Sequence, residues 1–174
     1  MTDQKKILMV VAQENFRDEE FFEPKEVFEK SGAKVTVSSN TTKKAKGMLG
    51  GKVNPDIKIS DVNIDEYDAI SITGGGGAKQ YLWENKDLQD IVKKANEQGK
   101  VVAAICISPV VLANAGVLEG KKSTVFKNDE TVRILKEKGA KHKDKGVISD
   151  GKIVTGRDPK SATEYGKAVL KALN

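Results

Sequence analysis

The chain has 174 residues, a formal net charge of +5 and 38% hydrophobic residues. This length suits one core, so we expect residues 1–174 to form a single domain. No apolar run approaches the roughly 20 residues that span a bilayer, which argues against a membrane protein. One cysteine and one histidine cannot form an internal disulfide or the usual zinc ligand sets, so no metal site is predicted.

The basic residues are scattered along the chain, with a denser cluster only at Lys43, Lys44 and Lys46. Aromatic residues do not alternate with them, whereas nucleic-acid-binding proteins gather basic residues on one face and add stacking aromatics. We therefore expect a solvated surface and no nucleic-acid partner. The first residues lack a signal-peptide pattern, and the predicted location is the cytoplasm.

The first forty residues predict a strand, a helix and a second strand. The apolar run from Lys5 to Val11 is typical of a central parallel strand. A helical pattern follows from Asp18 to Gly32, with its apolar residues expected on one side: Phe21, Phe22, Val27 and Phe28. Alternating Val35 and Val37 complete a βαβ unit, which predicts a parallel sheet.

The next segment, Thr41 to Asn54, is polar and predicts a surface loop or hairpin, and Asp56 to Ser60 suggests an edge strand. Asp68 to Thr73 predicts another strand, which ends in glycines 74–77. Glycine allows the backbone to approach a ligand or a neighbouring loop closely. The run matches neither common phosphate-binding motif, since Lys79 replaces the third glycine of one and no Gly-Lys-Ser/Thr follows for the other. Nucleotide binding is therefore not predicted.

Residues Val101 to Gly116 predict a strand, a tight turn and a helix, with Cys106 at the junction. Pro109 suits the first helical turn, and Gly116 suits the helix end. A nucleophile elbow has this geometry, and a helix N-terminus favours a thiolate. The alternative is a buried structural cysteine, because free cysteine is among the most buried residue types. This stretch alone leaves both interpretations open.

The remaining patterns complete an α/β fold. Leu88 to Ala95 predicts an amphipathic helix. After Gly116, the expected elements are a short strand at Thr124–Phe126, a helix at Thr131–Lys138, a hairpin around Asp150-Gly151, and a final helix capped by Ser161. Together the elements predict a three-layer α/β sandwich with a flavodoxin-like, mostly parallel sheet. Ligands of such sheets bind beyond the carboxyl ends of the strands, where Gly74 and Cys106 are expected.

Three motifs resemble those of a known family. They are Ala103-Ala104-Ile105-Cys106-Ile107-Ser108-Pro109, Ile72-Thr73-Gly74-Gly75, and Glu20 four residues before Pro24. The chain is similar over nearly its whole length to the ThiJ/PfpI family of the class I glutamine amidotransferase-like fold. That family includes the parkinsonism-associated deglycase and PfpI-type intracellular peptidases.

The resemblance implies that Cys106 is a nucleophile and a redox-sensitive thiol, with Glu20 as the acid beside it. It also implies an oxyanion hole formed by the N–H groups of Gly75 and Ile107. The supporting loop would contain Gly74, Ser108 and Pro109. A strand-end glycine and the residue after a nucleophile can both supply preorganised donors. The alternative for Glu20 is that it only stabilises the helix start, together with its two acidic neighbours.

The implied function is a cofactor-independent glyoxalase or deglycase that acts on small reactive carbonyls in stress protection, as a homodimer or larger homo-oligomer. A cysteine peptidase is the second possibility, although Ile107 stands where peptidase-like members have histidine. His142, the sole histidine, lies among lysines and is expected to be a solvated surface residue. A third possibility is a non-enzymatic redox sensor or chaperone with an oxidisable cysteine. The sequence does not separate the first possibility from the third.

Overall fold

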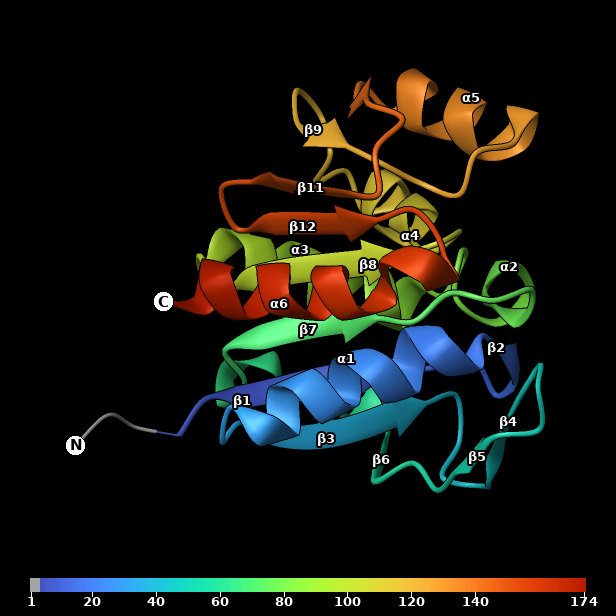
Figure 1. Ribbon diagram of the computed structural model, residues 1–174, viewed down its shortest axis with the longest axis vertical. Coiled ribbons are helices and arrows are strands. Elements are labelled where there is room, and N and C mark those ends of the chain that lie inside the picture. Colours follow the sequence, from blue (N-terminus) through green and yellow to red (C-terminus); the bar gives the residue numbers. More distant parts are fainter. Residues whose placement is uncertain (1–3) are drawn as a thin grey trace.

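A computed structural model describes residues 4–174, and its centre is a seven-stranded sheet (Figure 1). The strand order is β11-β12-β8-β7-β1-β3-β6. Their bounds are β1 (Lys6–Val10), β3 (Lys34–Ser39), β6 (Ile57–Lys58), β7 (Ala69–Ile72), β8 (Val101–Ile105), β11 (Val147–Asp150) and β12 (Ile153–Gly156). All neighbours run parallel except β11 and β12, so the predicted mostly parallel sheet is confirmed.

Helices cover both faces of this sheet. Helices α1 (Asp18–Lys30) and α6 (Ala162–Leu173) lie on one face, and α3 (Lys86–Glu97) and α4 (Pro109–Asn114) lie on the other (Figure 1). Each face has its own apolar cluster, and the central strands contribute to both because alternate side chains point to opposite faces. This double burial explains why β1, β7 and β8 are nearly continuous apolar runs, and it confirms the three-layer sandwich.

Smaller elements surround the sheet. Helices α2 (Gly77–Tyr81) and α5 (Asp129–Glu137) accompany two small sheets: β9 (Lys122–Ser123) with β10 (Lys141–His142), and β2 (Glu14–Phe16) with β4 (Ala45–Gly47) and β5 (Lys52–Val53). Short 3-10 turns span Ile59–Asp61, Ile64–Glu66 and Pro159–Ser161. The antiparallel pair β4–β5 confirms the predicted hairpin, and β6 confirms the predicted edge strand in a shorter form.

The predicted strand at Thr124–Phe126 is wrong. The backbone N–H of Thr124 donates to the hydroxyl of Thr155, and that of Phe126 donates to the carbonyl of Cys106. These bonds tie the stretch to β12 and to the elbow, and the strand lies just before it as β9.

Two other local expectations need correction. Ser161 precedes α6, but its hydroxyl donates to Asp158 instead of capping the helix. Asp158 in turn accepts the backbone N–H of Ser161. Phe22 does not share the buried side of α1, because it is 40% exposed.

Within residues 4–174, no helix has the length and apolar character needed to cross a membrane.

Candidate active site

Cys106 lies in a sharp turn between β8 and α4. Its φ angle is +66°, a left-handed conformation that is uncommon for residues other than glycine. Two hydrogen bonds hold the turn: the Cys106 N–H donates to the Gly156 carbonyl at 2.9 Å, and the Cys106 carbonyl accepts from Phe126 at 2.7 Å. Pro109 begins α4 as predicted. The strand-turn-helix therefore has the strained geometry of a nucleophile elbow.

The glycines after β7 allow Glu20 and Cys106 to meet. A Cβ atom on Gly74 would lie 2.4 Å from Cys106 Cβ and 2.5 Å from Glu20 Oε1, so both residues pack directly against this glycine. Gly75 has a φ of +104°, and a Cβ there would lie 2.3 Å from the backbone nitrogen of Arg17. Close packing with a neighbouring loop, one of the two roles expected for this run, therefore requires glycine at both positions.

Two backbone donors act on the Cys106 thiol. The N–H groups of Gly75 and Ile107 both lower its pKa, against the larger effect of burial. Ser108 fixes the elbow to the end of β7 by donating its hydroxyl to the Thr73 carbonyl at 2.7 Å. Of the site residues expected from the sequence, the structure thus gathers Glu20, Gly74, Gly75, Cys106, Ile107 and Ser108, with Pro109 opening the adjoining helix.

Glu20 is fully buried, and neither of its carboxyl oxygens has a hydrogen-bond partner among residues 4–174. Burial raises the pKa of Glu20 to about 8, although the neighbouring Cys106 thiol and the charge of Arg17 oppose this shift. The carboxyl is therefore protonated near neutral pH. In that form it can donate one proton and accept another, as general acid–base chemistry requires.

The expectation that a helix N-terminus lowers the pKa of Cys106 is wrong. Burial is the largest influence and, together with the charge of Glu20, raises the pKa of the thiol to about 12. The two backbone donors oppose the shift, while α4 has only six residues and so a short run of aligned peptide dipoles. The resting site consequently holds a thiol beside a carboxylic acid.

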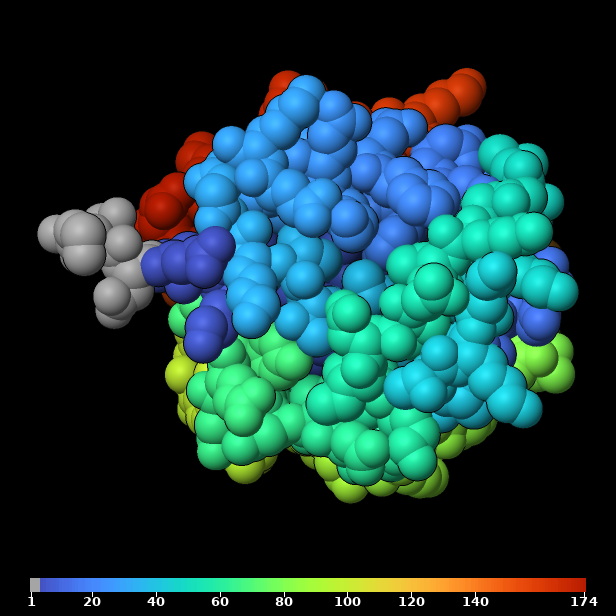
Figure 2. Space-filling model, turned by 90° about the horizontal axis from the view of Figure 1, so that it is seen from below, coloured from blue at the N-terminus to red at the C-terminus, as the bar shows by residue number. Residues whose placement is uncertain are grey.

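Sequence reasoning missed the residues that surround this pair. The backbone N–H of Arg17 donates to the Gly74 carbonyl at 2.9 Å. The Asp18 carboxylate accepts from the backbone N–H groups of Leu49 and Gly51 at 2.9 and 2.7 Å. The Asp18 bonds hold the loop at residues 47–51 beside the start of α1 (Figure 2). The acidic run predicted only a helix start, because its partners lie some thirty residues away in the sequence.

A pair of buried hydroxyl groups lies on the face of the central sheet that α1 and α6 cover. Tyr165 on α6 is hydrogen-bonded to Ser71 on β7 at 2.8 Å, and both are buried. Burial and the charge of Glu20 both raise the pKa of Tyr165, so its hydroxyl stays protonated. Only the packing of α6 onto the sheet brings these residues together.

His142 is not the solvated residue that the sequence suggested. It lies in β10 opposite Ser123, and its side chain is half-buried. Its Nε2 atom is buried and has no partner among residues 4–174, and burial lowers its pKa.

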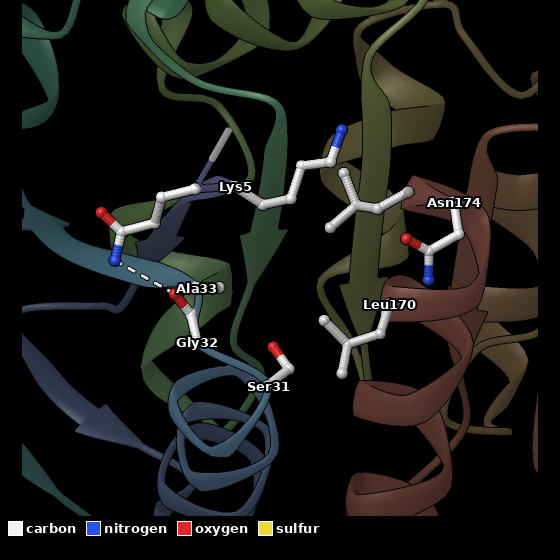
Figure 3. A pocket seen from close by; sticks show the side chains of 8 residues that line it. Lys5, Ser31, Gly32, Ala33, Leu170 and Asn174 are labelled. Carbon is white, nitrogen blue, oxygen red and sulfur yellow. Dashed lines mark hydrogen bonds between the residues drawn. The ribbon is translucent and has the colours of Figure 1, made fainter. Parts of the chain in front are cut away.

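A hollow of about 490 Å³ lies at the opposite end of the sheet, between the ends of α1 and α6 (Figure 3). Its lining includes Lys5, Ser31 and Leu170, and Gln4 donates to the Gly32 carbonyl at its edge. None of the predicted site residues lines it. Ligands of parallel sheets bind at the carboxyl ends of the strands, so this hollow is separate from the candidate active site.

Comparison with known proteins agrees with the fold. The family model "DJ-1/PfpI family" matches residues 5–172. An uncharacterised protein of Methanocaldococcus jannaschii is 51% identical over 97% of this chain and 82% of its own length, and a deglycase of Thermococcus kodakarensis is 34% identical over 95% and 98%. The crystal structure of a ThiJ/PfpI domain protein from Brachyspira murdochii has a TM-score of 0.94 at 36% identity, covering 99% of this chain and 98% of that one. The chain therefore belongs to the DJ-1/PfpI family.

Proposed function

We propose that this chain is an enzyme that uses Cys106 as a nucleophile on small reactive carbonyl compounds, such as 2-oxoaldehydes. The observation that carries the proposal is the packing of the Glu20 carboxyl and Cys106 against the same residue, Gly74, which places the two side chains next to each other. The deglycase name of the Thermococcus kodakarensis relative supports the same class of chemistry.

The two protonated groups can begin the reaction together. As the sulfur adds to the aldehyde carbon, one carboxyl oxygen of Glu20 accepts the thiol proton and the other donates its proton to the carbonyl oxygen. The product is a neutral hemithioacetal, and no free thiolate is needed. Such paired transfer suits a thiol whose pKa burial has raised.

The remaining steps use the same residues and water. Glu20 transfers a proton from the former aldehyde carbon to the neighbouring carbon, and the hydroxyl proton on the former aldehyde carbon moves to the oxygen of that neighbouring carbon. These two transfers convert the hemithioacetal into a thioester of a 2-hydroxy acid. Water then cleaves the thioester and regenerates the thiol. One 2-oxoaldehyde and one water give one 2-hydroxy acid, so the balance requires neither a cofactor nor an oxidant.

The backbone N–H groups of Gly75 and Ile107 supply the oxyanion stabilisation in this proposal. Both lower the pKa of the Cys106 thiol, which supports their nearness to any oxygen that forms on the attacked carbon. Donors fixed by the backbone need no reorganisation when negative charge develops.

The decisive experiment measures 2-hydroxy acid production from methylglyoxal by the wild type and by Cys106→Ser and Glu20→Gln variants. Both variants should lose activity, because one removes the thiol and the other removes the proton-accepting carboxyl. Glu29→Gln on the exposed side of the same helix is the matched control and should keep wild-type turnover. Wild-type turnover that survives Cys106→Ser would refute the proposal.

We also propose that the chain assembles as a homodimer or larger homo-oligomer. Three of the exposed large apolar side chains, Phe22, Met48 and Leu49, belong to α1 and the adjoining hairpin loop. Such a patch would gain from being covered. Sedimentation equilibrium tests this, and a monomer at micromolar concentration would contradict it.

A further inference from the structure

Arg17 and Glu19 form a charged fork beside the candidate active site. The guanidinium donates to both carboxylate oxygens of Glu19, with Nε–Oε1 at 2.9 Å and Nη2–Oε2 at 3.0 Å. Bidentate pairs of this kind have a fixed geometry. The side chains are 30% and 31% exposed, so solvent reaches the fork but does not surround it.

The backbone fixes this fork relative to the catalytic pair. Arg17 immediately precedes α1, and its N–H donates to the Gly74 carbonyl at 2.9 Å. Gly74 is the residue against which Glu20 and Cys106 both pack. The backbone nitrogen of Arg17 also packs against Gly75, where an added Cβ atom would lie 2.3 Å from it. The backbone of Arg17 is therefore tied to the strand end that forms the site, three residues before Glu20.

The other polar groups near the pair do not duplicate this charge. Asp158, from the turn after β12, is negative and paired with Arg157. Tyr165 from α6 and Ser71 from β7 are neutral hydroxyls bonded to each other. Of the charged groups named here, Arg17 is the cation that lowers the pKa of Glu20, and the charges of Glu20 and Cys106 in turn raise the pKa of Arg17, while Glu19 and Asp158 act on Glu20 in the opposite direction.

We propose that Arg17 is a positioning residue whose charge favours ionisation of the Glu20–Cys106 pair, and that Glu19 limits this effect by neutralising it. Neither residue touches the reacting atoms in this proposal. The proposal deepens the function proposed above, but its effect is read on the thiol itself and does not depend on carbonyl turnover.

The proposal predicts opposite effects from neighbouring substitutions. Arg17→Gln removes the positive charge, so the fraction of Cys106 thiolate at a given pH should fall. Glu19→Gln leaves Arg17 unneutralised, so the thiolate fraction should rise. Partial exposure screens both charges, and we expect about a two- to ten-fold change in either direction. The thiolate fraction of the double variant, which carries both substitutions, should be close to that of the wild type.

The assay is the rate of iodoacetamide alkylation between pH 6 and pH 9, which reports on Cys106 alone because it is the single cysteine. Below the thiol pKa, this rate follows the thiolate fraction. The matched controls are Lys25→Gln and Glu29→Gln, which break the ion pair between these residues further along the same helix. Both should react like the wild type. Raising the salt concentration to about 1 M should shrink the differences between the Arg17 and Glu19 variants, because it screens exposed charges.

Arg17→Lys separates charge from shape, since it keeps the charge but loses the fork, and its rate should stay within about two-fold of the wild type. If Arg17→Gln unfolds, Arg17→Lys and Glu19→Gln still decide the matter. The proposal is overturned if Glu19→Gln fails to raise the rate, if both charge-removing variants shift it in one direction, or if the control pair shifts it equally. If the alkylation pattern holds but methylglyoxal turnover is absent, the proposed function fails and the role of Arg17 stands.

Discussion

Replacing Gly74 by alanine should damage the active site more than any neighbouring glycine-to-alanine change at an open position. The added Cβ would lie 2.4 Å from Cys106 Cβ, 2.5 Å from Glu20 Oε1 and 2.6 Å from the Ile105 carbonyl oxygen, where ordinary contacts begin at 3.4 Å. These atoms would each have to retreat by about 1 Å in a packed interior. The Ile105 oxygen belongs to central strand β8, so the movement falls mainly on the catalytic pair.

Overpacking of this kind costs about 1 to 3 kcal/mol in the free energy of unfolding. A displacement of about 1 Å between reacting groups costs on the order of 100-fold in rate. Urea unfolding and methylglyoxal turnover should therefore both change in Gly74→Ala, with turnover the more sensitive of the two.

Gly76→Ala is the matched control, two residues along the same run. Gly76 has φ −57° and ψ −30°, which any residue adopts, and a Cβ there meets nothing within 4 Å. The free energy of unfolding of Gly76→Ala should stay within about 1 kcal/mol of the wild-type value or rise slightly. If Gly74→Ala keeps wild-type stability and turnover, or if Gly76→Ala is equally harmful, the close packing of Glu20 and Cys106 against Gly74 is not what the site requires.

Three further predictions concern the same pair. Because burial raises the pKa of Glu20 from 4.5 to about 8, its contribution to stability is fully present below pH 4.5 and is lost as the pH rises through 8. The free energy of unfolding of Glu20→Gln, measured in urea, should therefore rise relative to that of the wild type by on the order of 4 kcal/mol between pH 5 and pH 8. A difference between the two proteins that does not change with pH would contradict the burial argument. Mild peroxide should take Cys106 to the sulfinic acid, adding two oxygen atoms in intact mass, since no second cysteine resolves the sulfenic acid; Glu20→Leu should abolish this preference, and unchanged oxidation would remove Glu20 from that chemistry. Peptide amides should be cleaved at most very weakly, because Ile107 can neither activate the thiol nor protonate an amine leaving group, and robust fluorophore release that disappears in Cys106→Ala would favour a peptidase instead.

Local patterns were sufficient to predict the sheet and the elbow. Buried parallel strands such as β1 and β8 leave continuous apolar runs, and proline and glycine mark the two ends of α4, so each signal lies within a few residues. The position of Cys106 at the end of a strand followed directly from these signals. The role of Glu20 came from the resemblance, because its acidic neighbours serve a helix start equally well.

Tertiary structure alone decided the chemistry of the pair. The pKa of a thiol depends on the balance between burial, nearby charge and hydrogen bonds, and the sequence showed only the helix that follows Cys106. Burial and the charge of Glu20 outweigh that short helix and reverse the expected shift in the pKa of Cys106. The strand prediction at Thr124–Phe126 was wrong for a related reason, because the backbone groups of this segment bond to Thr155 and Cys106, which are distant in the sequence. The local sequence does not indicate which distant residues the folded chain brings into contact.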